Sequence, residues 1–434
     1  MSKQSQIKAI KGMKDILPSQ SHYWLKVESL CADIFAKRAY RQIRMPIMES
    51  TSLFARSIGS ETDIVSKEMY TFDDRNGDSL TLRPEGTASC VRAGIENGLF
   101  YNQQQRLWYV GPMFRHERPQ KGRYRQFHQV GVECYGWETP DIEAEVLAMV
   151  YDLFQELGLS HTILYINSLG DAESRARYKE ALVEYLQQHF DDLDEDSQRR
   201  LKTNPLRILD SKNAQVQSLL TDAPNILDFL SEQSQAHFAS LQSYLLALGI
   251  PFEINSKLVR GLDYYNDTVF EWVNHDYGAQ STVCGGGRYD GMVAQMGGQP
   301  TPAFGFGMGL ERLIEMLQEQ ESDSLQVEEV SDVFIVSVSD AGRMQALSLQ
   351  QTLTQNGIRV LCHLGGGSMK NQFKKADKSG AKLALVIGES EAETHTVNLK
   401  ALRKELVDQN LGAQQQNIKQ EEALIFVTNL LDSL

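Results

Sequence analysis

The sequence is poor in cysteine, in long apolar runs and in positive charge, and each shortage excludes a class of protein. Its five cysteines are scattered, odd in number and without Cys-x-x-Cys spacing, which predicts reduced, mostly buried thiols rather than a disulfide framework or a zinc site. No stretch approaches the length of a membrane span, and the polar start of the chain has no apolar signal core. We therefore expect a cytoplasmic protein without membrane contact.

A net charge of −14 excludes a general polyanion binder, because any nucleic acid would have to meet local basic patches against the overall field. The glycine-rich segment 285–291 is neither a Walker loop nor a dinucleotide fingerprint, since it lacks the Gly-Lys-Ser/Thr ending and the acidic partner. What is present is apolar material: 41% of 434 residues are hydrophobic. That amount suits roughly three domains with real cores.

Strand-like segments dominate residues 44–136, with a hairpin expected over 68–83 around Arg75-Asn76-Gly77-Asp78. Thr139-Pro140 is typical of a helix start, and apolar spacing carries that helix to about Leu157. Hairpins and meanders of this kind indicate an α+β fold rather than a parallel βαβ series. Further strands are expected over 107–114 and 124–136.

Later segments change character twice. Residues 171–250 are polar and helix-periodic, broken at Pro205 and Pro224, which predicts a helical insertion before strand patterns resume. An acidic, weakly apolar linker is expected over 318–329, followed by strands alternating with helices, as in a small α/β domain with a largely parallel core. The predicted domains are a core in two parts, a helical insertion and a C-terminal domain, over 1–170 with 251–325, 171–250 and 330–434.

Two arginines stand in unlike settings. Arg115, in Phe114-Arg115-His116-Glu117, follows an apolar strand-like run, and Arg312 opens a helix behind the alternating glycines of Gly307-Met308-Gly309-Leu310-Glu311-Arg312. Two permanently charged guanidinium groups from separate elements suit the phosphates of a nucleoside triphosphate. A surface salt bridge is the plain alternative for either arginine alone.

Both stretches resemble motifs of class II aminoacyl-tRNA synthetases. Thr81-Leu82-Arg83-Pro84-Glu85-Gly86-Thr87-Ala88 resembles the amino-acid loop of that class. Leu258-Val259-Arg260-Gly261-Leu262-Asp263-Tyr264-Tyr265 and Gly285-Gly286-Gly287-Arg288-Tyr289-Asp290-Gly291 resemble segments peculiar to histidyl-tRNA synthetases. The resemblance covers nearly the whole chain. It implies an antiparallel-sheet catalytic core with a helical insertion, a C-terminal α/β anticodon-binding domain, and the ATP-dependent joining of histidine to its tRNA.

Residues 123–134 read as a strand whose side chains alternate between two faces. Val130 and Val132 favour packing into a core on one face. The other face carries Gln129 and Glu133 on either side of Gly131, which leaves a notch between two polar arms. A solvated strand face is the alternative. If the notch is a pocket, Glu133 would accept an imidazole N–H and fix the tautomer.

The resemblance supplies the rest of a histidine pocket, with Glu133 setting specificity. Tyr265 is placed toward the imidazole and Tyr264 beside it. The two adjacent tyrosines, in an expected strand, should face opposite ways. Ligands for the amino group map onto Glu85, Thr87 and Gln129. The full set implied for histidine is Glu85, Gly86, Thr87, Arg115, Gln129, Glu133, Arg260, Tyr264, Tyr265 and Tyr289.

The implied reaction joins the histidine carboxylate to the α-phosphorus of ATP, and this nucleophile needs no general base because it is already ionised. Arg115 and Arg260 are the expected catalytic residues, and Arg312 would clamp the γ-phosphate. An ion pair with Asp263 or Glu271 is the alternative for Arg260. Mg²⁺ is expected with ATP, and neither zinc nor a carboxylate cage is. The ATP-binding set is Arg115, Glu117, Arg123, Gly305, Gly307, Gly309 and Arg312.

Two basic stretches are candidates for tRNA. In the loop 115–125 the resemblance places Arg118 and Gln120 near the acceptor stem; a solvated charged hairpin is the alternative. In the C-terminal domain Lys370, Lys374 and Lys378 recur every four residues, a like-charge spacing that favours an anion opposite. Lys382 continues this repeat only if Ser379-Gly380 does not end the helix. Residues 40–49 resemble the first class II motif, which implies a homodimer.

Two other functions are compatible with this fold. One is a non-catalytic, histidine-sensing regulatory subunit of histidine biosynthesis, which could discard the phosphate-binding arginines and the anticodon domain. The other is a class II synthetase for another amino acid, against which Glu133 and the segment 260–265 argue.

Overall fold

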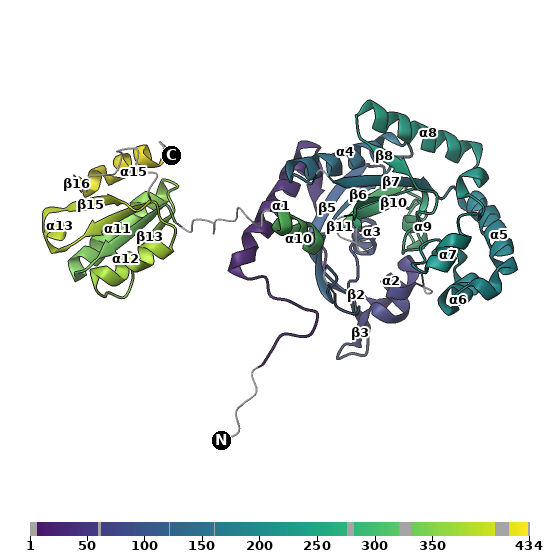
Figure 1. Ribbon diagram of the computed structural model, residues 1–434, viewed down its shortest axis with the longest axis horizontal. Helices are drawn as coiled ribbons and strands as arrows, with labels where there is room; N and C mark the ends of the chain where they lie inside the picture. Colours follow the sequence, from purple (N-terminus) through teal and green to yellow (C-terminus); the bar gives the residue numbers. More distant parts are fainter. Residues whose placement is uncertain are drawn as a thin grey trace, which may run out of the picture. The chain divides into compact units, whose positions relative to one another are not determined.

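The computed structural model describes residues 7–59, 62–120, 122–159, 161–275, 282–320, 331–403 and 416–432. The chain divides into two compact units, Met1–Gln320 and Glu321–Leu434 (Figure 1). Most of the expected linker, 318–329, lies outside the described residues. Within the described ranges, every helix is too short or too polar to cross a membrane.

An eight-stranded sheet forms the centre of the first unit. Its strands are Arg41–Gln42 (β1), Gln105–Phe114 (β5), Gln126–Tyr135 (β6), Thr162–Ser168 (β7), Phe252–Ile254 (β8), Asn266–Asn274 (β9), Thr282–Arg288 (β10) and Ala303–Gly309 (β11). Their order is β1-β5-β6-β11-β10-β9-β7-β8. Pairing is antiparallel except at the two edges, where β1 pairs with β5 and β8 with β7 in parallel. The expected antiparallel α+β core is confirmed.

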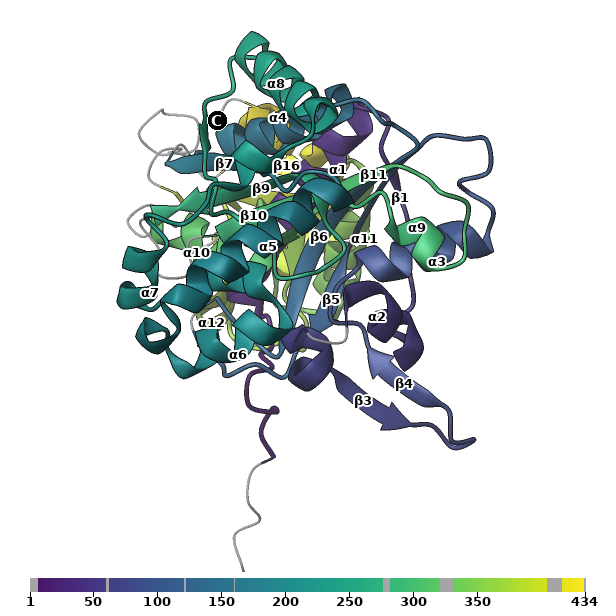
Figure 2. The same cartoon turned by 90° about the vertical axis from the view of Figure 1, so that its right-hand side faces the viewer.

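Helices cover both faces of this sheet (Figures 1 and 2). One face shares an apolar core with Pro18–Lys37 (α1), Asp141–Glu156 (α4), Glu232–Ala247 (α8) and Leu310–Gln320 (α10). Val130 and Val132 are fully buried on this face, as their alternation predicted. The other face packs against Thr51–Ile58 (α2), Thr87–Glu96 (α3) and Met292–Gln295 (α9). Glu133, pointing the opposite way from the valines, lies on this second side.

A three-stranded sheet stands beside the main one and contains the predicted hairpin. Its order is β2-β4-β3, formed by Met48–Ser50 (β2), Ser79–Leu82 (β4) and Tyr70–Asp73 (β3). The carboxylate of Asp74 accepts the backbone N–H groups of Asn76 and Asp78, and Gly77 has a φ of 88°. The turn residues therefore form the expected tight loop, which projects from the unit (Figure 2).

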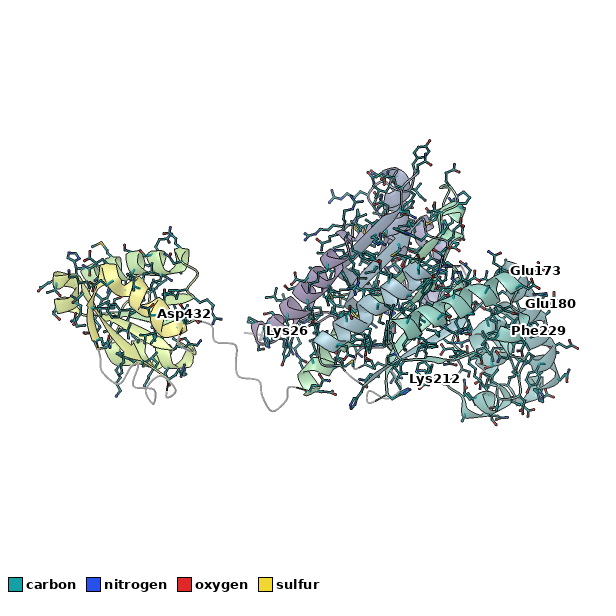
Figure 3. The ribbon with its side chains drawn as sticks, turned by 90° about the horizontal axis from the view of Figure 1, so that it is seen from above. Lys26, Glu173, Glu180, Lys212, Phe229 and Asp432 are labelled. Carbon is teal, nitrogen blue, oxygen red and sulfur yellow. The ribbon has the colours of Figure 1, made fainter. Side chains whose placement is uncertain are left out.

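Between β7 and β8 the chain is helical, as predicted. The helices are Ala172–Gln188 (α5), Glu195–Thr203 (α6), Ala214–Leu219 (α7) and α8, with short turns at Phe190–Asp192, Pro205–Ile208 and Ile226–Phe229. Side chains at the starts of these four helices accept first-turn N–H groups and so fix where each begins: Asp171, Asp194, Asn213 and Ser231. Glu173 and Glu180 lie exposed on the outer side of α5 (Figure 3). The limits of a separate insertion domain, 171–250, stay a prediction.

The second unit contains a five-stranded sheet in the order β13-β12-β14-β15-β16. Its strands are Val333–Ser337 (β12), Val360–Cys362 (β13), Leu383–Ile387 (β14), Thr396–Ala401 (β15) and Gln416–Lys419 (β16). Its helices are Asp340–Gln355 (α11), Met369–Lys378 (α12), Glu389–Thr394 (α13) and Ala423–Asp432 (α15). β12 pairs in parallel with β13 and β14, whereas the last two strands are antiparallel. The predicted strand–helix alternation with a parallel core is confirmed.

One expected strand is wrong. Residues 258–265 form a loop and a turn that lead into β9. The rings of Tyr264 and Tyr265 therefore do not face opposite ways but lie against each other, with centroids 4.6 Å apart. Strand alternation needs a continuous extended backbone, and the turn at Asp263 and Tyr264 interrupts it.

Candidate active site

A polar cleft of about 200 Å³ opens on the first unit, and four arginines line it: Arg123 and three others from separate parts of the chain. Arg115 follows the end of β5, Arg260 lies in the loop before β9, and Arg312 belongs to the first turn of α10. Of the residues predicted from the sequence, the cleft brings together Arg115, Glu117, Arg123, Gln129, Arg260, Gly307, Gly309 and Arg312.

Backbone carbonyl groups hold two of these arginines. Nε of Arg115 donates to the carbonyl oxygen of Pro84 at 2.8 Å, and its guanidinium lies 5.2 Å from the centre of the Phe127 ring. Arg312 donates to the carbonyl oxygens of Gly122, at 3.2 Å, and Thr282. These contacts orient the guanidinium groups without neutralising their charge. Thr282 was not foreseen, because a carbonyl that anchors a side chain leaves no mark in a sequence.

The electrostatics of the cleft favour an anion. Burial, together with the guanidinium charges of Arg123 and Arg115, lowers the pKa of Arg312 below its ordinary value. Glu117 counters part of this field, and its carboxylate lies 3.5 Å from Arg123. Like charges that depress one another are stabilised by a negative ligand between them. The cleft therefore has the charge expected of a phosphate site.

Arg260 lies where the two predictions for it can be compared, and its catalytic role stays a prediction. It lines the cleft, and it forms the ion pair with Glu271 that was one of the two alternatives. Burial opposes its charge, but Glu271 raises the pKa of Arg260 above the ordinary value. Glu271 is held in turn by the hydroxyl of Thr282, which donates at 2.9 Å. The guanidinium covers Gly285, where a Cβ would lie 2.5 Å from Nη1.

Glu133 does not line the cleft and is fully buried beside it in the sheet. Oε1 accepts hydrogen bonds from the hydroxyl groups of Thr87, at 2.8 Å, and Tyr109, at 3.0 Å, and Oε2 accepts one from Tyr289. Burial raises the pKa of Glu133 to about 8, against the lowering effect of these hydroxyl groups. A carboxylate can accept about four hydrogen bonds. Three protein donors therefore leave about one acceptor position for a ligand.

Tyr109 fills the notch that was predicted beside Gly131. The two residues pair across β5 and β6, and a Cβ on Gly131 would lie 2.1 Å from the tyrosine ring. A Cβ on Gly86 would lie 2.2 Å from the same ring. The missing side chain at Gly131 thus makes room for a protein ring that aims a hydroxyl at Glu133. The sequence holds a signal for it, since a large residue stands opposite a glycine, but only once the register is known.

The structure shows why residues 305 and 307 of β11 are glycines, which the sequence alone did not reveal. A Cβ on Gly305 would lie 2.1 Å from Oε2 of Glu133, and one on Gly307 would lie 2.3 Å from Nε2 of Gln129. These two glycines admit side chains from β6. A Cβ on Gly309 would meet nothing within 4 Å. Gly307 and Gly309 line the cleft, and Gly305 does not.

Glu85 and Tyr264, two more of the residues predicted for histidine, lie close enough to Glu133 to interact with its charge. Glu85 accepts the N–H groups of Thr87, at 2.7 Å, and Ala88, at 2.8 Å, at the start of α3. Burial raises the pKa of Glu85 despite these bonds. The rings of Tyr264 and Tyr289 lie 5.6 Å apart, in an edge-to-face contact. Among the described residues, no group of three or more His, Cys, Asp or Glu side chains is arranged to hold a metal ion.

The two basic stretches are exposed. Arg118 and Gln120 lie at the surface of a loop in which Gln120 and Arg123 exchange backbone hydrogen bonds of 3.0–3.1 Å. Lys370, Lys374 and Lys378 are exposed along α12. That helix ends at Lys378 and is followed by Ser379 and Gly380, whose φ is 79°. Lys382 is therefore excluded from the helical stripe, which contains three lysines at this spacing.

Two family models match the chain. One, described as histidyl-tRNA synthetase, matches residues 12–313. The other, described as an anticodon binding domain, matches residues 332–429.

Solved structures agree with these matches. The crystal structure of apo S. aureus histidyl-tRNA synthetase is 39% identical, with a TM-score of 0.80, and the match covers 97% of this chain and 100% of that one. Histidyl-tRNA synthetase from Nostoc sp. PCC 7120 is 19% identical, with a TM-score of 0.69 and coverage of 98% and 100%. An ATP phosphoribosyltransferase regulatory subunit/histidyl-tRNA synthetase from Bacillus halodurans C is 22% identical, with a TM-score of 0.64 and coverage of 89% and 99%. The last two show the fold alone.

An antiparallel sheet that carries an arginine-lined cleft, followed by an anticodon-binding domain, defines an aminoacyl-tRNA ligase with the class II synthetase fold. The first family model covers well over half of the chain, and the S. aureus enzyme matches almost all of it. The chain belongs to the histidyl-tRNA synthetase family.

The raised pKa of Glu133 predicts a pH-dependent penalty on the ligand-free fold. The folded state holds this proton more tightly than the unfolded chain, so the stabilising contribution is complete below pH 4.5 and is lost as pH rises through about 8. Glu133→Gln cannot ionise. It should raise the melting temperature by at least about 3 °C more at pH 9 than at pH 5.

Thermal unfolding of the full chain at the two pH values measures this difference. The exposed Glu96, changed to Gln, is the matched control and should show no such dependence on pH. An equal shift of the Glu133→Gln protein at both pH values would contradict the buried, raised carboxyl.

Proposed function

We propose that the cleft activates L-histidine with ATP to histidyl-adenylate and diphosphate, and that the protein then transfers the histidyl group to the 3′ end of histidine tRNA, releasing AMP. The observation that carries this proposal is the convergence of Arg115, Arg260 and Arg312 on one cleft that adjoins the buried carboxyl of Glu133. Membership of the histidyl-tRNA synthetase family supports it.

In the first step the histidine carboxylate attacks the α-phosphorus and the α,β-phosphoanhydride bond breaks, with the electron pair leaving on diphosphate. The nucleophile is ionised near neutral pH, so catalysis consists of alignment and charge stabilisation. Arg115 and Arg260 are the catalytic residues, each aimed at the carboxylate and the α-phosphate. Their anchors, the Pro84 carbonyl and Glu271, fix both forks before the substrates arrive.

ATP occupies the length of the cleft. Arg312 binds the γ-phosphate, where the mutual repulsion of the guanidinium groups is relieved by the triphosphate charge. Arg123 and Glu117 line the same stretch, and the open space above Gly309 lets the backbone approach the nucleotide. Gly305 and Gly307 contribute indirectly, by admitting the side chains of β6.

Magnesium accompanies the nucleotide. When bound it neutralises charge on the β- and γ-phosphates. Glu117 and Glu311 are the carboxylates on the cleft wall that would face it, and oxygen donors of this type fit a hard cation. Glu311 also accepts the N–H of His128, at 2.8–2.9 Å, so the protein orients it independently of the metal.

Histidine lies between the cleft and the buried pocket. The remaining acceptor position of Glu133 takes one imidazole N–H, and a hydroxyl from the Tyr264–Tyr265 pair serves the other ring nitrogen. Glu85, Thr87 and Gln129 surround the ammonium group, with Gly86 and Tyr289 completing the walls. Unpaired polar groups of such a pocket reject apolar analogues by about 10⁴–10⁵-fold.

Transfer RNA contacts both units. Arg118 and Gln120, exposed on the loop after β5, meet the acceptor end, and Lys370, Lys374 and Lys378 of α12 meet the anticodon arm. The protein works as a homodimer in the cytoplasm. A stripe of three exposed lysines in a chain of net charge −14 supports local rather than general attraction of RNA.

Amino-acid-dependent exchange of radioactive diphosphate into ATP tests the function directly. Histidine alone among the amino acids should support exchange, and charging should require histidine tRNA. Exchange with a different amino acid would assign the protein to another class II specificity. Absence of exchange with every amino acid would favour a non-catalytic regulatory subunit.

Replacing Arg260 should slow the activation step itself. Arg260→Gln removes one donor to the developing charge and should lower kcat for exchange about 10²–10³-fold, with a smaller change in KM. The matched control is Arg106→Gln, which removes an arginine from another partly buried ion pair of the same unit, with Glu145. A loss of similar size in both variants would show that broken ion pairs, not catalysis, explain the effect.

The lysines of α12 should control the salt dependence of tRNA binding. Lys370→Gln combined with Lys374→Gln should weaken binding and reduce the slope of log K against log salt by about one to two. Lys400→Gln combined with Lys419→Gln removes the same charge from exposed strand positions of the same unit. An unchanged slope in the α12 variant, or an equal change in the strand variant, would count against this interface.

A further inference from the structure

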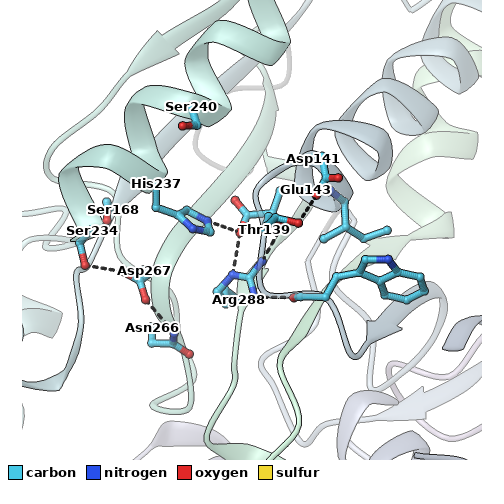
Figure 4. Close-up of polar contacts among 12 residues, drawn as sticks. Thr139, Asp141, Glu143, Ser168, Ser234, His237, Ser240, Asn266, Asp267 and Arg288 are labelled. Carbon is cyan, nitrogen blue, oxygen red and sulfur yellow. Dashed lines mark hydrogen bonds and ion pairs between the residues drawn. The ribbon is translucent and has the colours of Figure 1, made fainter. Parts of the chain in front are cut away.

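A buried ion cluster lies beneath the end of β10, away from the cleft (Figure 4). Its centre is Arg288, whose side chain is 2% exposed. Nε donates to Oε1 of Glu143 at 2.7 Å, and Nη1 donates to the carbonyl oxygen of Trp137 at 3.0 Å and to Asp290 at 3.2 Å. The guanidinium is therefore anchored on three sides by groups from separate elements.

Glu143 belongs to the first turn of α4 and is fully buried. Burial alone would raise its pKa, but the charge of Arg288 and the hydrogen bond with His237 hold the pKa of Glu143 below the ordinary value. The start of a helix adds a favourable field for a carboxylate. Glu143 is thus an ionised partner for Arg288 at neutral pH.

His237 of α8 completes the cluster from the helical segment between β7 and β8. Its Nε2 lies 2.7 Å from Oε1 of Glu143 (Figure 4), and because the carboxylate can only accept, Nε2 carries the proton. One turn earlier, the hydroxyl of Ser234 donates to Asp267 at 2.7 Å. Two contacts from one helix therefore fasten that segment to the start of β9 and to the ion cluster.

Arg288 fixes the stretch of chain that carries Tyr289. The regular register between β10 and β9 breaks between Gly287 and Arg288, whereas pairing with β11 continues to Arg288, so only one of the two neighbouring strands holds the residues that follow. Beyond this point Tyr289 donates its N–H to the carbonyl oxygen of Ala303 at 2.8 Å, and Asp290 accepts the N–H of Ala303 at 2.8 Å. While Arg288 points into the ion cluster, the hydroxyl of Tyr289 reaches Glu133 on the opposite side.

A buried ion pair is a poor device for stability, because the desolvation of two charges offsets most of their attraction. The advantage of such an ion pair is precise orientation, because each of its hydrogen bonds fixes an angle that apolar packing would not fix. Positional accuracy matters at Tyr289, since a shift of its hydroxyl would free the Oε2 atom of Glu133 and change which acceptor position a ligand meets.

We propose that Arg288 and Glu143 are positioning residues for histidine recognition, acting through Tyr289 on Glu133, and that His237 couples the helical segment to the same pocket. This inference rests on the proposed binding of histidine at Glu133. It assigns to the buried cluster an effect on the affinity for histidine and none on the binding of ATP.

A double-mutant cycle on the full-length chain tests the proposal. Glu143→Gln keeps the shape but removes the charge, and Tyr289→Phe removes only the hydroxyl. Glu143→Gln should raise KM for histidine in diphosphate exchange about five- to tenfold and leave KM for ATP unchanged. In the Tyr289→Phe background the same change should have almost no further effect. Glu145→Gln, two residues along α4 and paired with Arg106, is the matched control and should leave both KM values unchanged.

Independent, multiplicative effects of Glu143→Gln and Tyr289→Phe would overturn the proposal, as would equal changes in KM for histidine and for ATP. If Glu143→Gln does not fold, His237→Phe replaces it, because a phenyl ring fills the place of the imidazole without a donor. That variant removes a single hydrogen bond and should raise KM for histidine about two- to threefold, again only while Tyr289 is present. A wild-type protein without histidine-dependent exchange would instead refute the proposed function, so the two failures are distinguishable.

Discussion

The electrostatic cost of gathering several guanidinium groups in one cleft governs the architecture of this site. Burial and the charges of Arg123 and Arg115 lower the pKa of Arg312, and Glu117 acts in the opposite direction. Carbonyl groups from three places in the chain hold Arg115 and Arg312, and Arg123 pairs with Glu117. A negative ligand between these guanidinium groups would reduce their repulsion. Because the donors are fixed beforehand, little reorganisation remains when charge develops on a phosphate.

Glycines determine which side chains fit into the site, including those that are polar or ionisable. Gly305 and Gly307 admit Glu133 and Gln129 from the neighbouring strand, and Gly131 admits the ring of Tyr109. Each of these glycines is thus covered by a polar side chain from the neighbouring strand. A methyl group at any of these positions would push a functional group out of place. The glycine-rich sequence of β11 therefore makes room for Glu133 and Gln129 as well as lining the cleft.

Local sequence signals predicted what local physics determines. The hairpin around Gly77, the alternation of Val130 and Val132, and the end of α12 before Lys382 each depend on a few neighbouring residues, and each is confirmed. The arginines of the cleft came from a family resemblance, which carries long-range information that spacing does not. The predictions were incomplete or wrong where cross-strand register, or a turn without a clear sequence signal, determines the position of a side chain. Tyr109 entered the predicted notch through cross-strand register, and a turn before β9 brought the rings of Tyr264 and Tyr265 together. The partners Arg288 and Glu143 stand 145 positions apart in the chain, so nothing local connects them.

Glu133 and Arg260 are two buried ionisable groups of the same site, and the protein surrounds them in different ways. The carboxyl of Glu133 is surrounded by neutral hydroxyl groups, and burial raises its pKa to about 8. Directional hydrogen bonds from these hydroxyl groups set its orientation. Arg260 is instead paired with a full charge, Glu271, which keeps it ionised at every accessible pH. Recognition of a small heterocycle needs directional donors and acceptors with a defined tautomer, whereas stabilisation of a phosphate needs a charge that does not vary. The sheet holds Glu133 fully buried and Arg260 on the cleft wall, which suits the first to directional recognition and the second to a constant charge.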